Sequence, residues 1–391
     1  MKKIVFFCIP AHGHTNPTLG VVRELVNRGH QVLYYSYEMM RRKIEETGAV
    51  FVSCDPYDME QKLTPKDAAR LGSDLALSTR VLVETTLALD DAILRDMQQL
   101  QPDCIVADSM AVWGKAIALK LGIPFVSSTT TFAFNQHSAK IMNQGIGDLL
   151  RMLIAMPKVN RQVKRLQERR YPVRTILDII RNDDSTHTVV YTSPQFQPCS
   201  ETFSKEHYVF AGPSVREATA EVEKKREKLV YISMGTVNND MLPLYRSCIR
   251  ALEESPYQVI ISVGDQVKPE AFGTLPEHIS VYQSVDQIAV LQKADIFLTH
   301  CGMNSVSEAL YYGVPLVMRP KTTEQGGVAA RVFELGAGIY LKQETEKTIR
   351  KAIDEVLQTS AYREKAEVIA QGFHSCTGAI AAAEKILSVC R

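Results

Sequence analysis

Residues 296–310 read IFLTHCGMNSVSEAL, and this stretch decides how the second half of the chain folds. The apolar run that ends at Thr299 is typical of a buried strand. Gly302 permits a tight turn, and we expect a helix to begin near Asn304. A strand, a short loop and a helix in this order predict a parallel sheet covered by helices.

The predicted helix start is a candidate phosphate site. The first amides of a helix have no acceptor within it, and the helix dipole adds partial positive charge there. A diphosphate suits such a position, with side-chain donors from Asn304 and Ser305 and a ring N–H from His300. Asn304 and Ser305 are also common capping residues, so the helix start alone leaves both interpretations open.

Other residues of this half have side chains that suit the hydroxyls of a ribose or another sugar, or a further phosphate contact. Glu308 lies one turn beyond Asn304, where its carboxylate could accept hydrogen bonds from ribose hydroxyls. Glu324-Gln325, in a predicted loop after strand Leu316–Met318, suits vicinal sugar hydroxyls. The loop Ser233-Met234-Gly235-Thr236 follows the first strand of this half and suits phosphate. Each group also has an ordinary structural interpretation, as surface or turn residues.

The first half opens on a second strand–loop–helix pattern. Ile4–Ile9 is a continuous apolar run, shorter than the ~7–15 residues of a signal-peptide core, and predicts a buried strand. We expect a loop over Pro10–Pro17, a helix from Thr18 with Gly29 as its C-cap, and a strand over Gln31–Tyr35. This is a βαβ unit.

The alternation continues through the chain and predicts an α/β fold with two Rossmann-like domains facing across a cleft. We expect one domain at 1–212, a charged linker at 213–228, a second domain at 229–376 and a final helix at 377–391. Further strands are predicted at Cys104–Ala107, Ile123–Ser127, Val189–Thr192, Tyr208–Ala211, Leu229–Ser233, Val259–Val263 and Ser280–Tyr282.

Composition narrows the class of protein. The net charge is +1, 45% of residues are hydrophobic, and the eight cysteines are scattered. We therefore expect a reduced cytoplasmic protein with no nucleic-acid partner and no integral membrane contact. The basic segment Lys158–Arg170 suits a solvated face better than a membrane surface. No G-x-G-x-x-G follows either first strand, which argues against a dinucleotide oxidoreductase.

Two histidines and an aspartate are the candidates for proton transfer. His12 and His14 follow the first predicted strand, and a neutral imidazole with a pKa near ~6.5 can accept a proton at pH 7. Asp108 ends another strand of the same predicted sheet, where it can hold a histidine tautomer or cap the next helix. The H-x-H spacing also suits a metal, but no third Cys or His lies nearby. No Asp-x-Asp occurs in the chain, so we predict no metal and no other cofactor.

Several motifs in a fixed order resemble one enzyme family. Residues 281–338 contain V-D-Q-I-A-V-L, A-D-I-F-L-T-H-C-G-M-N-S, S-E-A-L-Y-Y-G-V-P, T-E-Q and G-A-G, and A-H-G-H-T-N-P and I-S-M-G-T precede them. Together they resemble the family 1 UDP-dependent glycosyltransferases of GT-B fold, most closely the bacterial macrolide-glycosyltransferase branch. The resemblance covers nearly the whole chain and is weakest from about 135 to 225.

This resemblance assigns roles to the domains and to the candidate residues. It implies that 1–212 binds the acceptor, that 229–376 binds the nucleotide sugar, and that the helix at 377–391 packs back on the first domain. It implies that His14 is the general base and Asp108 its acidic partner, and that main-chain groups near Val285 meet the uracil. The diphosphate would be held by His300, Asn304 and Ser305, the ribose by Glu308, and the transferred sugar by Glu324 and Gln325. Two positions depart from the family: Ser284 replaces an aromatic residue under the base, and Asp286 replaces a proline.

The implied reaction is an inverting, metal-independent transfer of a hexose from a UDP-sugar to a hydroxyl. Glucose is the favoured candidate for this hexose. The implied acceptor is a small hydrophobic molecule such as a macrolide, a flavonoid or another phenol or alcohol. Acceptor contacts are expected from Phe132, Phe134, the loop around Tyr57, and residues 70–90 and 135–155. A sugar-nucleotide epimerase and a nucleotide-sugar-binding protein of the same architecture are the alternatives.

Overall fold

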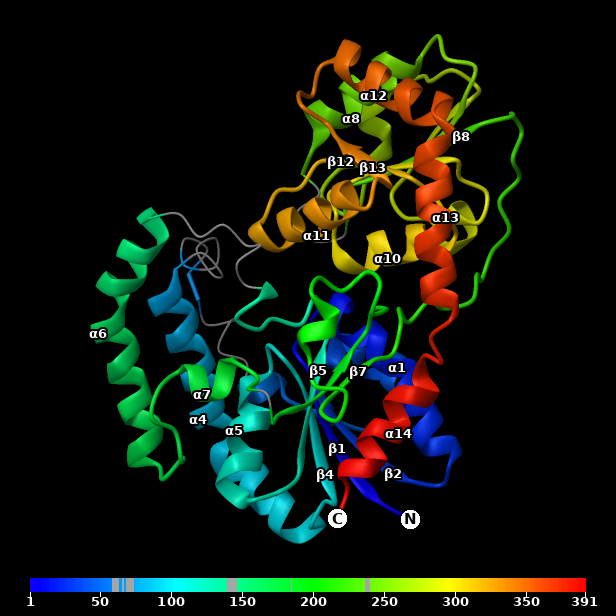
Figure 1. Cartoon of the computed structure of the whole chain (residues 1–391). Helices are drawn as coiled ribbons and strands as arrows, with labels where there is room; N and C mark the ends of the chain where they lie inside the picture. The colour runs from blue at the N-terminus through cyan, green and yellow to red at the C-terminus, as the bar shows by residue number, and fades with distance from the viewer. Residues whose placement is uncertain (58–62, 65–66, 68–73, 139–145, 184, 236–239) are drawn as a thin grey trace. The chain divides into compact units, whose positions relative to one another are not determined.

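The computed structural model describes residues 1–391 except 58–62, 65–66, 68–73, 139–145, 184 and 236–239 (Figure 1). The chain forms two compact units. The first unit contains Met1–Thr192, Cys199–Ser214 and Cys376–Arg391, and the second contains Ser193–Pro198 and Val215–Ser375. Each is built on a parallel sheet, so the predicted α/β class is confirmed. In the part of the chain described, no helix combines the length and apolarity needed to cross a bilayer.

The described part of the first unit has a seven-stranded sheet in the order β3-β2-β1-β4-β5-β6-β7, with all pairs parallel. Strand β1 is buried on both faces, because Ile4 and Phe6 join one core cluster while Val5 and Phe7 join the other. The strands are β1 (Lys3–Phe7), β2 (Gln31–Ser36), β3 (Val50–Ser53), β4 (Cys104–Asp108), β5 (Phe125–Thr129), β6 (His187–Val190) and β7 (Tyr208–Phe210).

The described part of the second unit has a six-stranded parallel sheet in the order β10-β9-β8-β11-β12-β13. Thr299 at the end of β11 pairs with Ser233 of β8 on one side and Met318 of β12 on the other. Three strands therefore end at the same level of one sheet edge. The strands are β8 (Leu229–Ser233), β9 (Gln258–Ser262), β10 (Ile279–Tyr282), β11 (Ile296–Thr299), β12 (Leu316–Met318) and β13 (Gly338–Tyr340).

Helices cover both faces of each sheet (Figure 1). In the first unit, α4, α5 and α6 pack on one face, and α1 and the C-terminal helix α14 pack together on the other. In the second unit, α8 packs with α12, and α10 with α13. The longer helices are α1 (His12–Asn27), α4 (Leu75–Leu100), α5 (Val112–Leu121), α6 (Ile146–Glu168), α8 (Leu242–Leu252), α10 (Met303–Tyr311), α11 (Thr323–Glu334), α12 (Glu346–Gln358), α13 (Ser360–His374) and α14 (Ala379–Val389).

Two loop predictions are wrong. The helix after β1 begins at His12 rather than Thr18 and contains Pro17, although proline removes one amide from the helical hydrogen bonds. Buried side chains along 15–25 anchor α1 in the core, and this packing outweighs the low helix propensity of its first turns. Glu324 and Gln325 lie in the first turn of α11 rather than in a loop. The short edge strands β3 and β13 are additions to the predicted set.

Candidate functional site

The helix start after β11 is free of side-chain capping. Gly302 is the N-cap of α10, and Asn304 and Ser305 lie inside the first turn, so neither is the capping residue that the sequence left possible. The first intrahelical bond runs from Val306 N to Gly302 O at 3.0 Å. The amides of 303–305 therefore lie outside the helix's own hydrogen bonds, and the positive end of the dipole accompanies them. An anion is the natural ligand of this position.

The turn before α10 is conformationally strained. Cys301 is fully buried and has a φ of +68°, in the left-handed region that costs a non-glycine residue roughly 1 kcal/mol. Cys301 lies where the chain leaves the end of β11 and enters α10, so the strained residue is part of this turn. Backbone strain of this kind often marks a functional turn.

The ring of His300 is held between two glycines. A Cβ at Gly235 would lie 2.5 Å from Cε1 of His300, and a Cβ at Gly302 would lie 2.7 Å from Nε2. Gly235 also has a φ of +83°. Burial, helped by the positive charge of Lys321, lowers the pKa of His300 to about 4. The ring is therefore neutral at pH 7 and can donate a single N–H toward a phosphate oxygen.

Gln287 connects three residues of this region through its side-chain amide. Its Oε1 accepts a hydrogen bond from Tyr231 Oη at 3.1 Å, and its Nε2 donates to Ser305 Oγ at 3.3 Å and to Glu308 Oε2. Burial raises the pKa of Glu308, while the hydrogen bond from Gln287 acts in the opposite direction. Hydroxyl donors from a ligand would further stabilise the ionised carboxylate.

The two residues expected to hold the sugar differ in their surroundings. Gln325 completes a capping box with Thr322, because its Oε1 accepts hydrogen bonds from Lys321 N at 2.9 Å and Thr322 N at 3.3 Å. This role occupies the oxygen of Gln325, so its side-chain NH₂ is the group suited to a ligand. The neighbouring Glu324 is exposed.

The other residues predicted to bind the donor, where the structure describes them, lie at or just after the ends of β8 and β10 in the same sheet. Ser233 ends β8, and its Oγ accepts a hydrogen bond from Gly235 N at 3.4 Å. Thr236 lies outside the described residues. Val285 immediately precedes Asp286, the N-cap of α9 (Gln287–Leu291).

In the first unit the structure brings His14 and Asp108 together. His14 Nδ1 lies 2.8 Å from Asp108 Oδ2 and 3.1 Å from Thr130 Oγ1. The other carboxylate oxygen of Asp108 accepts a hydrogen bond from Met110 N at 2.9 Å. The N-cap of α5 is Ala111, so capping that helix is not what Asp108 does. With its proton on Nδ1, His14 carries its lone pair on Nε2, as a general base requires.

His12 has different neighbours. Its Nδ1 lies 3.3 Å from Lys43 Nζ, and burial together with that positive charge lowers its pKa. A cation beside this nitrogen opposes metal binding there, which favours a structural or pocket role for His12.

Comparisons with known proteins decide the family. The model of the family described as UDP-glucoronosyl and UDP-glucosyl transferase matches residues 192–375. A Bacillus subtilis protein named uncharacterized UDP-glucosyltransferase YojK is 31% identical, over 99% of this chain and 97% of its own. The chain belongs to this glycosyltransferase family.

Two further relatives extend the likeness. The oleandomycin glycosyltransferase of Streptomyces antibioticus is 27% identical over 90% of this chain and 81% of its own. The crystal structure of the glycosyltransferase of kitacinnamycin has a TM-score of 0.85, with 23% identity over 100% of this chain and 99% of that one. The predicted GT-B fold of the glycosyltransferase is thereby confirmed.

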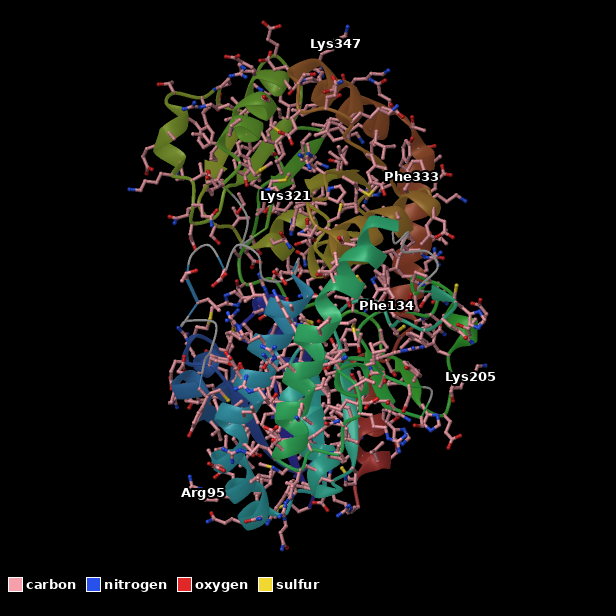
Figure 2. The ribbon with its side chains drawn as sticks, turned by 90° about the vertical axis from the view of Figure 1, so that its left-hand side faces the viewer. Arg95, Phe134, Lys205, Lys321, Phe333 and Lys347 are labelled. Atoms are coloured by element: carbon pink, nitrogen blue, oxygen red, sulfur yellow. The ribbon has the colours of Figure 1, made fainter. Side chains whose placement is uncertain are left out.

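The structure describes only some of the residues expected to contact the acceptor of the glycosyltransferase. Phe132 is buried, Phe134 is 44% exposed (Figure 2), and Tyr57 packs against the core of the first unit. Of the predicted acceptor ranges, 70–73 and 139–145 lie outside the described residues, as do the side chains of 146–153.

Four residues with contacts in or near these sites were not singled out from the sequence: Gln287, Thr130, Lys321 and Arg216. Gln287 carries a weak signal, since it belongs to the V-D-Q motif. The other three reach their sites only through folding. The register of Thr299 with Met318, and the bond from Arg319 N to Thr299 O, bring 319–321 alongside the turn before α10, where Lys321 (Figure 2) acts on His300.

Proposed function

We propose that this glycosyltransferase transfers a hexose, with glucose as the favoured candidate, from a UDP-sugar to a hydroxyl of a small hydrophobic acceptor. The acceptors we propose are macrolides, flavonoids and other phenolic or alcoholic natural products. The observation that carries the proposal is the 2.8 Å contact between His14 Nδ1 and Asp108 Oδ2. A histidine oriented by a buried carboxylate suits proton removal from an alcohol or phenol.

The proposed reaction is a single displacement. His14 takes the proton of the acceptor hydroxyl at Nε2, and Asp108 stabilises the imidazolium that forms. The hydroxyl oxygen forms a bond to the anomeric carbon as the bond from that carbon to the diphosphate oxygen breaks. UDP leaves with the electron pair. Because attack and departure occur on opposite faces of the sugar, the anomeric configuration inverts.

The leaving diphosphate is proposed to rest at the start of α10. The amides of 303–305, the helix dipole and one N–H of His300 face the charge that develops on the leaving oxygen. Lys321 adds a cation near this position. These groups supply positive charge without a metal ion, which supports the proposal of metal-independent transfer. Glu308, oriented by Gln287, is proposed to accept hydrogen bonds from the ribose.

The relatives support the proposed substrates. One is named a UDP-glucosyltransferase and another an oleandomycin glycosyltransferase, which favours UDP-glucose as donor and a natural product as acceptor.

The test is to incubate the enzyme with UDP-α-glucose and a panel of phenol and macrolide acceptors, with and without EDTA. We expect a β-linked glucoside by NMR, one UDP released for each product, and no effect of EDTA. Retention of the α configuration would contradict the single displacement. Isomerised UDP-sugar formed without acceptor would indicate an epimerase instead.

A further inference from the structure

Asp286, which stands where the family carries a proline, caps α9. Its side chain accepts hydrogen bonds from Ile288 N at 3.2 Å and Ala289 N at 3.5 Å. A proline at this position could not supply that cap. The presence of Asp286 instead of proline therefore gives α9 an N-cap, and this cap uses only the Oδ1 atom of Asp286.

Asp286 also binds a segment about seventy residues earlier in the chain. Its carboxylate accepts hydrogen bonds from Arg216 Nη2, from Thr219 N, from Thr219 Oγ1 at 2.8 Å and from Ala220 N at 3.1 Å. Burial acts to raise the pKa of Asp286, but the hydrogen bonds from Arg216 and Thr219 outweigh it and hold the pKa well below its usual range. The side chain is 7% exposed. The carboxylate is therefore an ionised anchor for residues 216–220.

This anchor places Arg216 at the nucleoside end of the proposed donor site. Asp286 lies between Val285, the residue expected to meet the base, and Gln287, which holds Glu308. The charge of Arg216 also acts on Glu308, where it opposes the rise in pKa caused by burial. The side chain of Arg216 remains 50% exposed, so its guanidinium keeps accessible surface while Nη2 donates to Asp286 and Nη1 donates to Glu217 O at 2.8 Å.

We propose that Arg216, oriented by Asp286, binds the donor nucleoside by stacking its planar guanidinium on the base. This inference rests on the proposed function, because it needs a nucleotide donor. Ser284, at the position of the family's aromatic residue, offers no flat face to a base. The planar guanidinium of Arg216 has a flat face, and guanidinium groups stack on aromatic rings and nucleobases. Asp286 is a positioning residue, and Arg216 is the residue that contacts the ligand.

The experiment measures binding of UDP and of inorganic diphosphate to the full chain by calorimetry. The variants are Arg216→Ala, Arg216→Lys and Asp286→Asn. Lysine keeps the charge without the plane, and asparagine keeps a capping oxygen without the charge that holds the guanidinium. The matched control is Arg250→Ala, because Arg250 is a half-exposed arginine paired with Glu346 elsewhere in the same unit.

We expect Arg216→Ala and Arg216→Lys to weaken UDP binding about ten-fold or more, a common cost of losing one base-stacking side chain. Asp286→Asn should weaken it in the same direction. Diphosphate binding, and UDP binding by Arg250→Ala, should match the wild type. The selective loss of UDP affinity is the signature that a purely structural role of Arg216 would not produce.

Three results would overturn the inference. They are wild-type UDP affinity in Arg216→Ala, full affinity in Arg216→Lys, and an equal loss of UDP and diphosphate binding in Arg216→Ala. A wild type that binds no UDP would contradict the proposed function itself and the inference with it. The two failures are therefore distinguishable.

Discussion

His14 Nδ1 lies 2.8 Å from Oδ2 of Asp108, whose side chain is completely buried, while 20% of the His14 side chain remains exposed. The histidine comes from the first turn of α1 and the aspartate from the end of β4, ninety-four residues later. The sheet brings them together because β1 and β4 are adjacent parallel strands. One partner is shielded and the other is accessible, as an oriented base requires.

Replacing Asp108 by Asn should lower kcat by at least about 100-fold, because the amide keeps the shape but neither fixes the same tautomer nor stabilises the imidazolium. Steady-state kinetics with a phenolic acceptor measure the effect. Thr130→Val is the comparison, since Thr130 also contacts Nδ1 but carries no charge, and it should cost much less. Equal kcat in Asp108→Asn and wild type would remove Asp108 from the mechanism.

Gly235→Ala should displace the ring of His300, since the new Cβ would lie 2.5 Å from Cε1. We expect UDP binding to weaken about ten-fold or more, measured by calorimetry. Gly273→Ala is the control, because Gly273 has a φ of +65° but nothing within 4 Å of its added Cβ. Both glycines have a positive φ, so a similar change in UDP affinity in the two variants would show that His300 is not involved.

The stability of the protein should depend on pH through His300. Since burial lowers the pKa of His300 from 6.5 to about 4, the unfolded chain binds a proton in this window that the folded chain does not. The free energy of unfolding is therefore unaffected by the titration of His300 above pH 6.5. It decreases by about 1–3 kcal/mol as the pH falls toward 4, because protonation of His300 favours the unfolded chain. Between pH 7 and pH 4.5, the melting temperature of His300→Gln should decrease less than that of the wild type. Parallel losses in the two proteins would contradict the assignment.

Gln287→Leu should weaken UDP binding while leaving the chain folded, because leucine fills a similar volume but cannot donate to Ser305 and Glu308. Removing the amide leaves the carboxylate of Glu308 with less stabilisation, so its pKa should rise further and the loss of affinity should be larger at pH 6 than at pH 8. Calorimetry at the two pH values measures this. An unchanged affinity at both would show that Gln287 has no part in donor binding.

Sequence patterns predicted the central strands of both sheets well. The bounds of Leu229–Ser233, Ile296–Thr299 and Leu316–Met318 agree with the structure because continuous apolar runs are typical of strands buried on both faces. The edge strand β3 was missed because it is short and Val50 is 52% exposed. The start of α1 was missed because Gly13 and Pro17 favour a loop, whereas packing of the following turns against the core decides the outcome.

The candidate site could be predicted only where its residues lie in local motifs. The helix start at Gly302 follows from a short stretch of sequence, and so does the position of Glu308. The contacts of Asp286 with Arg216, of Thr130 with His14 and of Gly235 with His300 join residues from 65 to 116 positions apart. Such contacts depend on strand order and register, which local periodicity does not contain.

The most direct test of the central claim compares wild type with His14→Ala in the presence of UDP-glucose and a phenolic acceptor. Product is followed by mass spectrometry, and UDP binding is measured separately by calorimetry. We predict that the wild type adds one hexose to the acceptor, and that His14→Ala does so at least about 100-fold more slowly while binding UDP with unchanged affinity. Transfer by His14→Ala at the wild-type rate would contradict the account.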